Sequence, residues 1–230
     1  MKKLIISFLL INIACFGTAQ EIEIRYEVRG NYKRTILKEN LLNVKTMKDI
    51  NPGYPSSWIS GYASVELLTT SMSGKVLKAS SSNDTLNQQQ IDLLQKAGAG
   101  TLISVAIKYL PEGQTDFRDM NFSYTLVPSV EASFPNGYDQ LKAYLKTNAI
   151  DKLKGKVDPK DLELVTVTFN VNENGAIEHA EIEVSSDDEK IDQLLLEVVN
   201  QMPNWNPAID SNGDKVTQRF MLQVGYMAGC

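Results

Sequence analysis

The sequence predicts an α+β protein in which a smaller β-rich domain precedes a C-terminal domain. We expect that C-terminal domain to be a three-stranded antiparallel sheet with two helices on one face. Two observations support this class: alternating apolar residues flank the turn "NENG", and apolar residues recur at helical spacing on both sides of that hairpin. The predicted segments are 1–19 (export signal), 20–57 (strand and helix), 58–128 (β-rich) and 131–230 (C-terminal domain).

The first nineteen residues resemble a cleavable export signal. Lys2 and Lys3 precede an apolar run over residues 4–15, and the small residues Gly17 and Ala19 suit cleavage after position 19. The predicted location of the mature protein is therefore the periplasm, with attachment to the outer membrane as an alternative.

Two other interpretations of this segment remain open. A membrane anchor is one, but about 16 mostly apolar residues interrupted by Ser7 and Asn12 are fewer than the roughly 20 that a spanning helix needs. Lipid attachment at Cys15 is the other, although Asn12 stands where such sites usually have an aliphatic residue.

Charge and cysteine content narrow the function classes. The chain has 23 basic and 28 acidic side chains, a net charge of -5, and loss of the signal would make the balance more acidic. Binding to nucleic acid or anionic lipid through bulk charge is therefore not expected. Cys230 would be the only thiol left, so no intramolecular disulfide is expected and stability must come from the hydrophobic core.

The N-terminal half shows strand and helix patterns. "EIEIRYEVR" over residues 21–29 alternates apolar and charged residues and predicts a half-buried strand. Thr35–Ile50 has looser helical spacing and ends before Asn51-Pro52, which predicts a modest helix. Within 58–128, "YASVELLTT", "GKVLKAS", "TLISVAIKYL" and "MNFSYTLVP" predict strands, and "LNQQQIDLLQKAGAG" predicts a helix that ends at its glycines.

The C-terminal third predicts helix, hairpin, helix and a last strand. Leu141, Tyr144 and Leu145 mark the first helix, and "LELVTVTFNVNENGAIEHAEIEVSS" forms the hairpin. Residues 186–189 resemble a capping box before the apolar stripe of the second helix, which runs to Met202.

One of only two tryptophans lies in "MPNWNPAIDSNGDKV", between two prolines. Pro203 ends the preceding helix, and Pro207 biases Asn206 toward extended backbone, so Trp205 is held on a stiff linker. We expect its ring to fill the gap between helix and sheet, a burial that stabilises the fold by up to about 4 kcal/mol.

The order of these elements, with "VTFNVNENGAI" and "MPNWNPAIDSNGDKV", resembles the C-terminal domain of TonB over residues 133–224. One departure is that "NAIDKLKGKVDPKD" replaces the Tyr-Pro motif usual in that family. The preceding unit weakly resembles the periplasmic repeats of the gliding-motility protein GldM, through "NDTL", the Gln-rich helix and the glycine stop.

The TonB resemblance implies a partner. In that family the last strand is an exposed sheet edge that receives an extended segment, the TonB box of an outer-membrane transporter, by strand addition. The matching residues, expected here as the partner-binding edge, are Lys215, Val216, Thr217, Gln218, Arg219, Phe220, Met221, Leu222, Gln223 and Val224. The outward set, at positions 217, 219, 221 and 223, is polar enough to stay soluble while unpaired.

The sequence offers no constellation for catalysis, and we expect no enzyme, no cofactor and no metal. His179, the sole histidine, lies among glutamates on the polar side of a strand, where a solvated face is a better interpretation than a metal site. The acidic run 187–189 fits a helix N-terminus, and "DSNGD" lacks the glutamate that would complete a calcium loop, because Met221 stands there.

Two functional hypotheses follow. The first is an exported interaction module whose TonB-like domain captures an extended segment of an envelope protein, with a TonB-dependent outer-membrane receptor as the leading partner. The chain shows no long Pro-rich spacer, which argues against direct energy transduction. The second is a structural subunit of an envelope secretion or gliding-type machine, in which the GldM-like unit makes the main contacts and the last domain forms a homodimer.

Overall fold

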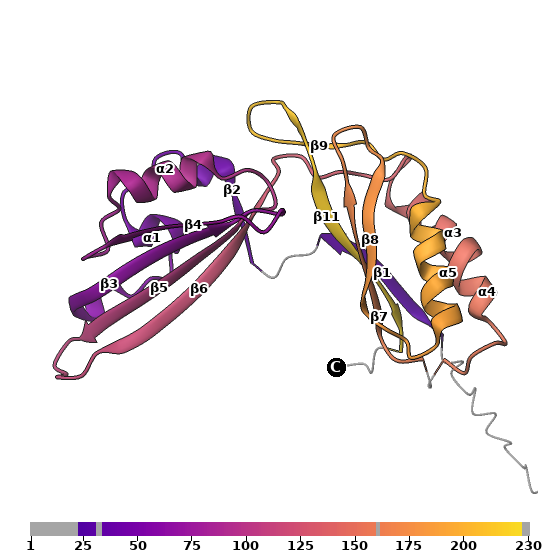
Figure 1. The fold of residues 1–230 in the computed structure, drawn as a ribbon, viewed down its shortest axis with the longest axis horizontal. Coiled ribbons are helices and arrows are strands. Elements are labelled where there is room, and N and C mark those ends of the chain that lie inside the picture. Colours follow the sequence, from indigo (N-terminus) through magenta and orange to yellow (C-terminus); the bar gives the residue numbers. More distant parts are fainter. Residues whose placement is uncertain (1–22, 31–33, 160–161, 227–230) are drawn as a thin grey trace, which may run out of the picture.

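The computed structural model describes residues 23–30, 34–159 and 162–226, which form an α+β fold with two main sheets (Figure 1). Helices cover one face of each sheet (Figure 1). The expected signal segment, the candidate lipid site at Cys15 and the thiol of Cys230 lie outside the described residues. Within these ranges, no helix is both long and apolar enough to cross a membrane.

The first sheet contains five strands, all antiparallel except for one pair. Their order is β2 (Thr35–Leu37), β6 (Arg118–Val127), β5 (Leu102–Pro111), β3 (Ile59–Thr70) and β4 (Val76–Ser81), with β2 parallel to β6. Alternate residues on the central strands, such as Val65, Ile103 and Val105, pack with Leu94 of α2 (Gln88–Lys96) in one buried cluster. The strands and the helix predicted within 58–128 are therefore present.

The helix predicted over Thr35–Ile50 is wrong. This stretch forms β2, a 3-10 turn (Lys38–Leu41) and a four-residue helix, α1 (Met47–Ile50); a second 3-10 turn, Ser56–Trp58, precedes β3. Ile36, Leu41, Val44, Met47 and Ile50 are buried without sharing one helical stripe, because the chain bends between them, and Leu42 is exposed. At the start of helix α1, the backbone N–H groups of Lys45 and Thr46 donate to the Asp49 carboxylate at 2.9 and 2.8 Å. These hydrogen bonds hold the pKa of Asp49 below its usual range.

Lys38 connects the 3-10 turn to the end of α2. Its Nζ donates to the carbonyl oxygens of Leu94 at 3.0 Å and Ala97 at 2.7 Å, at the helix end where carbonyls lack partners. Lys38→Met should therefore lower the free energy of unfolding by about 1–3 kcal/mol, measured by urea denaturation. The matched control is Lys96→Met, because Lys96 is exposed at the end of α2. We expect this change to cost under about 0.5 kcal/mol. Equal effects of the two changes would contradict this role.

The second sheet contains four antiparallel strands in the order β1 (Arg25–Gly30), β11 (Gln218–Gly225), β7 (Val165–Val171) and β8 (Ile177–Val184). One face carries α3 (Tyr138–Leu145), a π-helical turn (Lys146–Ile150), α4 (Asp151–Leu153) and α5 (Glu189–Asn200) (Figure 1). A short ribbon of β9 (Ala208–Ile209) and β10 (Lys215–Val216) precedes β11. The predicted hairpin is present as β7 and β8, and both predicted helices are present.

The sequence predicts three strands for this sheet, but a fourth joins it from the far end of the chain. The indigo strand β1 lies beside the yellow strand β11 (Figure 1). The sequence also suggests one N-terminal segment over 20–57, whereas the structure places β1 in the second sheet and β2 in the first. Segments 58–128 and 131–230 are thus each completed by a different piece of the N-terminal region.

Trp205 occupies the predicted gap between helix layer and sheet, and this prediction is confirmed. The side chain is 4% exposed and its ring centroid lies 5.7 Å from that of Phe134, 6.0 Å from Phe169 and 5.0 Å from Phe220. Helix α5 ends at Asn200, just before Pro203. Asn206 and Ser133 exchange backbone hydrogen bonds at 2.8 and 3.0 Å, which fastens the linker on the other side of the ring.

The start of α5 differs from the predicted capping box. Asp188 is the N-cap and accepts from the Lys190 backbone, while the Asp192 carboxylate accepts from the hydroxyls of Ser185 and Ser186, both at 2.6 Å. Burial opposes ionisation of Asp192, but the hydrogen bonds from the two serines outweigh it and lower the pKa below the usual 3.8. A carboxyl group whose pKa is lower in the folded than in the unfolded state adds stability above the unfolded value.

The stabilisation by Asp192 should therefore be complete at pH 6 and should decline as pH falls below 3.8 through the lowered pKa. Asp192→Asn should cost about 1–3 kcal/mol at pH 6 and clearly less at pH 3. Urea denaturation of both proteins at the two pH values measures this difference. A loss of equal size at both pH values would contradict the assignment.

Candidate functional site

The last strand does not form a free edge, which corrects the expectation for residues 215–224. Strand β11 pairs with β7 on one side and with β1 on the other, from Arg25 opposite Gly225 to Gly30 opposite Phe220. Lys215 and Val216 belong to β10 and pair with β9 instead. The physical reason is that β1 has filled the hydrogen-bonding edge that the resemblance assigns to a partner.

The outward side chains of this strand are also engaged within the chain. Arg219 Nη2 donates to Glu181 Oε1 at 2.9 Å and to Thr168 Oγ1 at 3.0 Å. Gln223 Oε1 accepts from Arg29 at 3.2 Å, and the hydroxyl of Thr217, which lies between β10 and β11, donates to Glu173 at 2.8 Å. On the other face, Gln218, Phe220, Leu222 and Val224 are buried, as the alternation predicts, whereas Met221 points outward and is half-buried.

The described residues place no strand against the outer side of β1, so this strand is now one edge of the sheet. The opposite edge, β8, is irregular: its pairing with β7 shifts register twice, and His179 has a φ of 53°. Such bulges make an edge a poor template for another strand. Strand β1 pairs with β11 without a register shift over all six residues. The regular edge of this sheet is therefore β1.

Side chains on the helix-facing side of β1 anchor this strand to the core. Ile24 and Val28 are buried in the core, and the Tyr26 hydroxyl donates to the backbone carbonyl of Lys142 on α3 at 3.3 Å. Full burial of each aliphatic side chain contributes about 1.5–3 kcal/mol. A partner that had to displace β1 would lose this stabilisation, whereas a partner that adds to its outer side would not.

Two hollows border β1 on the helix-facing side. The first, of about 490 Å³, lies beside Val28 and is lined by the aromatic rings of Phe134, Tyr138, Trp205 and Phe220 among others. The second, of about 400 Å³, lies beside Ile24 and is lined by the π-helical turn and by residues 154–159. Both volumes fall in the range of about 300–1,000 Å³ that is typical of ligand pockets.

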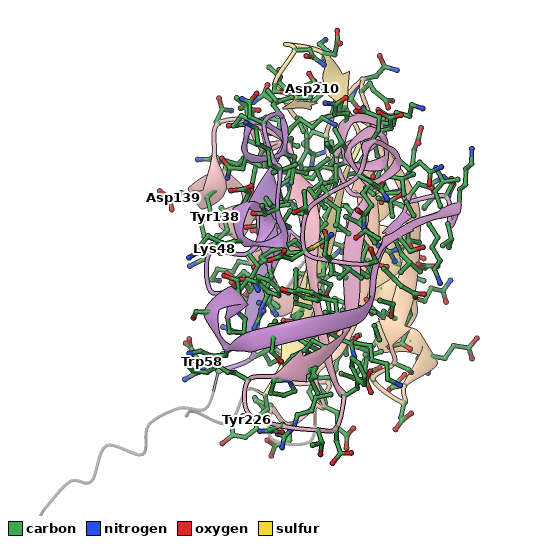
Figure 2. The ribbon with its side chains drawn as sticks, turned by 90° about the vertical axis from the view of Figure 1, so that its left-hand side faces the viewer. Lys48, Trp58, Tyr138, Asp139, Asp210 and Tyr226 are labelled. Atoms are coloured by element: carbon green, nitrogen blue, oxygen red, sulfur yellow. The ribbon has the colours of Figure 1, made fainter. Side chains whose placement is uncertain are left out.

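The surface next to these hollows is rich in lysine. Residues 138–154 contain Lys142, Lys146, Lys152 and Lys154 against only Asp139 and Asp151, although the whole chain has a net charge of -5. Lys146 and Lys154 lie 3.0 and 3.8 Å from Asp151, and the hydrogen bond from Lys146 lowers the pKa of that carboxyl group. The Lys142 ammonium lies 5.3 Å from the ring centre of Tyr138, which is at the surface (Figure 2).

The remaining candidates from the sequence are clusters of metal ligands, the histidine His179 and the segment "DSNGD". Among the residues that the structure describes, no cluster of three or more His, Cys, Asp or Glu side chains could hold a metal ion. His179 is exposed at the irregular part of β8. The Asp210 carboxylate accepts from the backbone of Asn212 and Asp214 at 2.8 and 3.0 Å, so "DSNGD" forms a turn.

Comparison of the chain with protein-family models, with curated proteins and with solved structures finds no match. The functional argument therefore depends on the geometry of β1 and the two hollows.

Sequence reasoning missed β1 as the edge of this site. The alternation over residues 21–29 correctly predicts a strand, but no local signal says which sheet that strand joins. The π-helical turn, which carries Lys146 and Ile150 to the second hollow, was missed as well. The run of lysines over residues 142–156 could have pointed to a basic surface here, but not to the π-helical geometry.

Proposed function

We propose that the chain is an exported, non-enzymatic interaction module of the bacterial cell envelope, which binds an extended partner segment by strand addition to the outer side of β1. The observation that carries this proposal is a regular strand edge, bordered by two hollows, against which no other strand of residues 23–30, 34–159 and 162–226 pairs. An antiparallel sheet of β11, β7 and β8 with helices on one face supports the proposal, and β1 extends this sheet by one strand.

Strand addition suits this edge energetically. In an antiparallel pair, alternate residues of a strand direct their N–H and C=O groups to one neighbour, so half of those on β1 point away from β11. Each hydrogen bond to an incoming segment contributes about 0.5–1.5 kcal/mol, and side chains that enter the hollows add apolar burial. Backbone pairing alone is insensitive to sequence, so the hollows would supply the specificity.

The partner we propose is an envelope protein with an exposed extended segment, in the first place a TonB-dependent outer-membrane receptor, which the chain would bind in the periplasm.

A second candidate function, that of a structural subunit of an envelope secretion or gliding-type machine, has one observation in its favour. Trp58, with 72% of its surface exposed, and Phe117, with 48%, lie at the same end of the first sheet, where the β5–β6 hairpin turns beside the start of β3. Exposed aromatic side chains are enriched at protein interfaces.

Site-specific photo-cross-linking in living cells tests these alternatives. A photoreactive amino acid at Glu27, exposed on β1, should attach to an extended segment of an outer-membrane receptor. The same group at Glu183, exposed on the irregular edge β8, is the matched control and should give no such product. Identical products from both positions, or none from Glu27, would contradict the proposal. Secretion or motility components attached to position 58 would instead favour the structural subunit.

A further inference from the structure

The two hollows lie on one side of β1 and are separated along it. Val28 and Gly30 border the first hollow, whereas Tyr26 and Ile24, the residue just before β1, border the second. Corresponding residues of the two pairs, such as Ile24 and Val28, are four positions apart, and the Tyr26 hydroxyl donates to the carbonyl of Lys142. Residues 24, 26 and 28 alternate with 25, 27 and 29, so all three side chains point toward the helices. A segment paired with the outer side of β1 would present every second side chain to this same surface.

The spacing of the hollows sets the spacing of the side chains that can enter them. An antiparallel or parallel strand advances about 3.3 Å per residue, so Ile24 and Val28 are about 13 Å apart along β1. Two side chains of an added strand match this distance when they are four residues apart. Residues three apart point to opposite faces of the strand, so only one of them can reach a hollow.

The linings of the hollows indicate what would enter them. The first hollow has the buried side chains of Phe134, Leu141 and Trp205 and the half-exposed ring of Tyr138 in its wall, which suits an aromatic or large aliphatic group. The second has the apolar side chains of Ile150 and Val157, beside Lys146 and Lys154. Residues 138–154 contain four lysines against two aspartates, and Arg29, Glu23 and Glu131 of the linings bring the balance to five basic against four acidic groups. This small positive surplus favours a partner with acidic residues.

We propose that the two hollows bind large apolar side chains four residues apart in an acidic, extended peptide that pairs with the outer side of β1. This inference rests on the proposed function and adds the chemical class of the partner segment to it. The first hollow takes the aromatic or aliphatic anchor. The second takes a smaller apolar group, and acidic residues of the peptide next to it lie near the surplus lysines.

The test uses two synthetic peptides of identical composition and about ten residues, a usual strand length. Both alternate threonine with alanine and begin with two aspartates; one carries phenylalanine and valine four residues apart, and the other carries them three apart. The protein is the full exported chain with Trp58→Phe, an exposed change that leaves Trp205 as its one tryptophan. Because Trp205 lines the first hollow, its fluorescence reports occupation of that hollow.

We expect the four-residue spacing to bind at least about tenfold more tightly, since burial of one additional apolar side chain is worth about 1.4 kcal/mol or more. Tyr138→Ala should weaken binding of that peptide about fivefold or more through loss of a wall of the hollow, and Tyr138→Phe should not, because the ring remains. Tyr138 is 50% exposed, so both variants should fold.

Equal affinity for the two peptides, absence of binding, or indifference to Tyr138→Ala would overturn the inference. Cross-linking from Glu27 to an envelope partner together with any of these results would leave the proposed function standing without the spacing rule. Absence of both cross-linking and peptide binding would overturn both proposals. Concentration-dependent dimerisation that the peptide does not reverse would show that a second copy occupies this edge, and would likewise overturn the inference.

Discussion

Replacing Gly175 with alanine is expected to destabilise the C-terminal sheet by about 3–5 kcal/mol, because two penalties coincide at this turn. Gly175 has a φ of +81°, a conformation that side chains disfavour. A Cβ atom here would lie 1.9 Å from the carbonyl oxygen of Trp205, and the contact is with backbone that cannot rotate away. The Trp205 N–H also donates to the Gly175 carbonyl at 2.8 Å, so the turn and the tryptophan linker would have to separate.

Gly213→Ala provides the matched control for this change. Gly213 has a similar φ of +87° in the turn before β10, but nothing lies within 4 Å of an added Cβ. It should therefore show only the conformational cost of about 1–2 kcal/mol. Urea denaturation followed by circular dichroism measures both variants. A loss for Gly175→Ala no larger than that for Gly213→Ala would show that the close approach to Trp205 is relieved at little cost.

Trp205→Ala is expected to have the second large effect, a loss of about 3–5 kcal/mol in the free energy of unfolding. The indole contacts the rings of Phe134, Phe169 and Phe220, so its removal would leave a cavity between helix layer and sheet. Trp205→Phe should cost much less, about 1–2 kcal/mol, for two reasons. A phenylalanine keeps most of the aromatic contact, and the described part of the chain offers the buried Nε1 no hydrogen-bond partner whose loss would add to the cost.

Thermal denaturation of the two Trp205 variants, with Trp58→Phe as the exposed control, measures this difference. Trp58→Phe should stay within about 0.5 kcal/mol of the parent protein. A loss for Trp205→Phe as large as that for Trp205→Ala would mean that the indole N–H or the full ring size is required. In that case a polar partner for Nε1 would have to be sought among the groups around the first hollow.

Features that depend on a few neighbouring residues could be predicted from the sequence. The turn "NENG" and the prolines on either side of Trp205 act within a few residues, so the hairpin, the end of α5 and the burial of the indole could all be predicted. The start of α5 could not, since Asp192 competes for the hydroxyls of Ser185 and Ser186, and the choice among nearby acids depends on how the turn folds. The helix expected over 35–50 failed because tertiary burial overrode a weak periodicity.

By itself, the sequence determined the hairpin, the last strand and the two longer helices of the C-terminal half, which face of each is apolar, and that Trp205 lies inside. Only the tertiary structure decided which strand edge is left unpaired. Residues at opposite ends of the described chain, Arg25 and Gly225, are neighbours in the sheet. Backbone hydrogen bonds are the same for every residue type, so a strand pattern specifies a buried face but no partner strand. The choice of partner follows from long-range packing of Ile24 and Val28 against the helices, and that choice moves the available edge from β11 to β1.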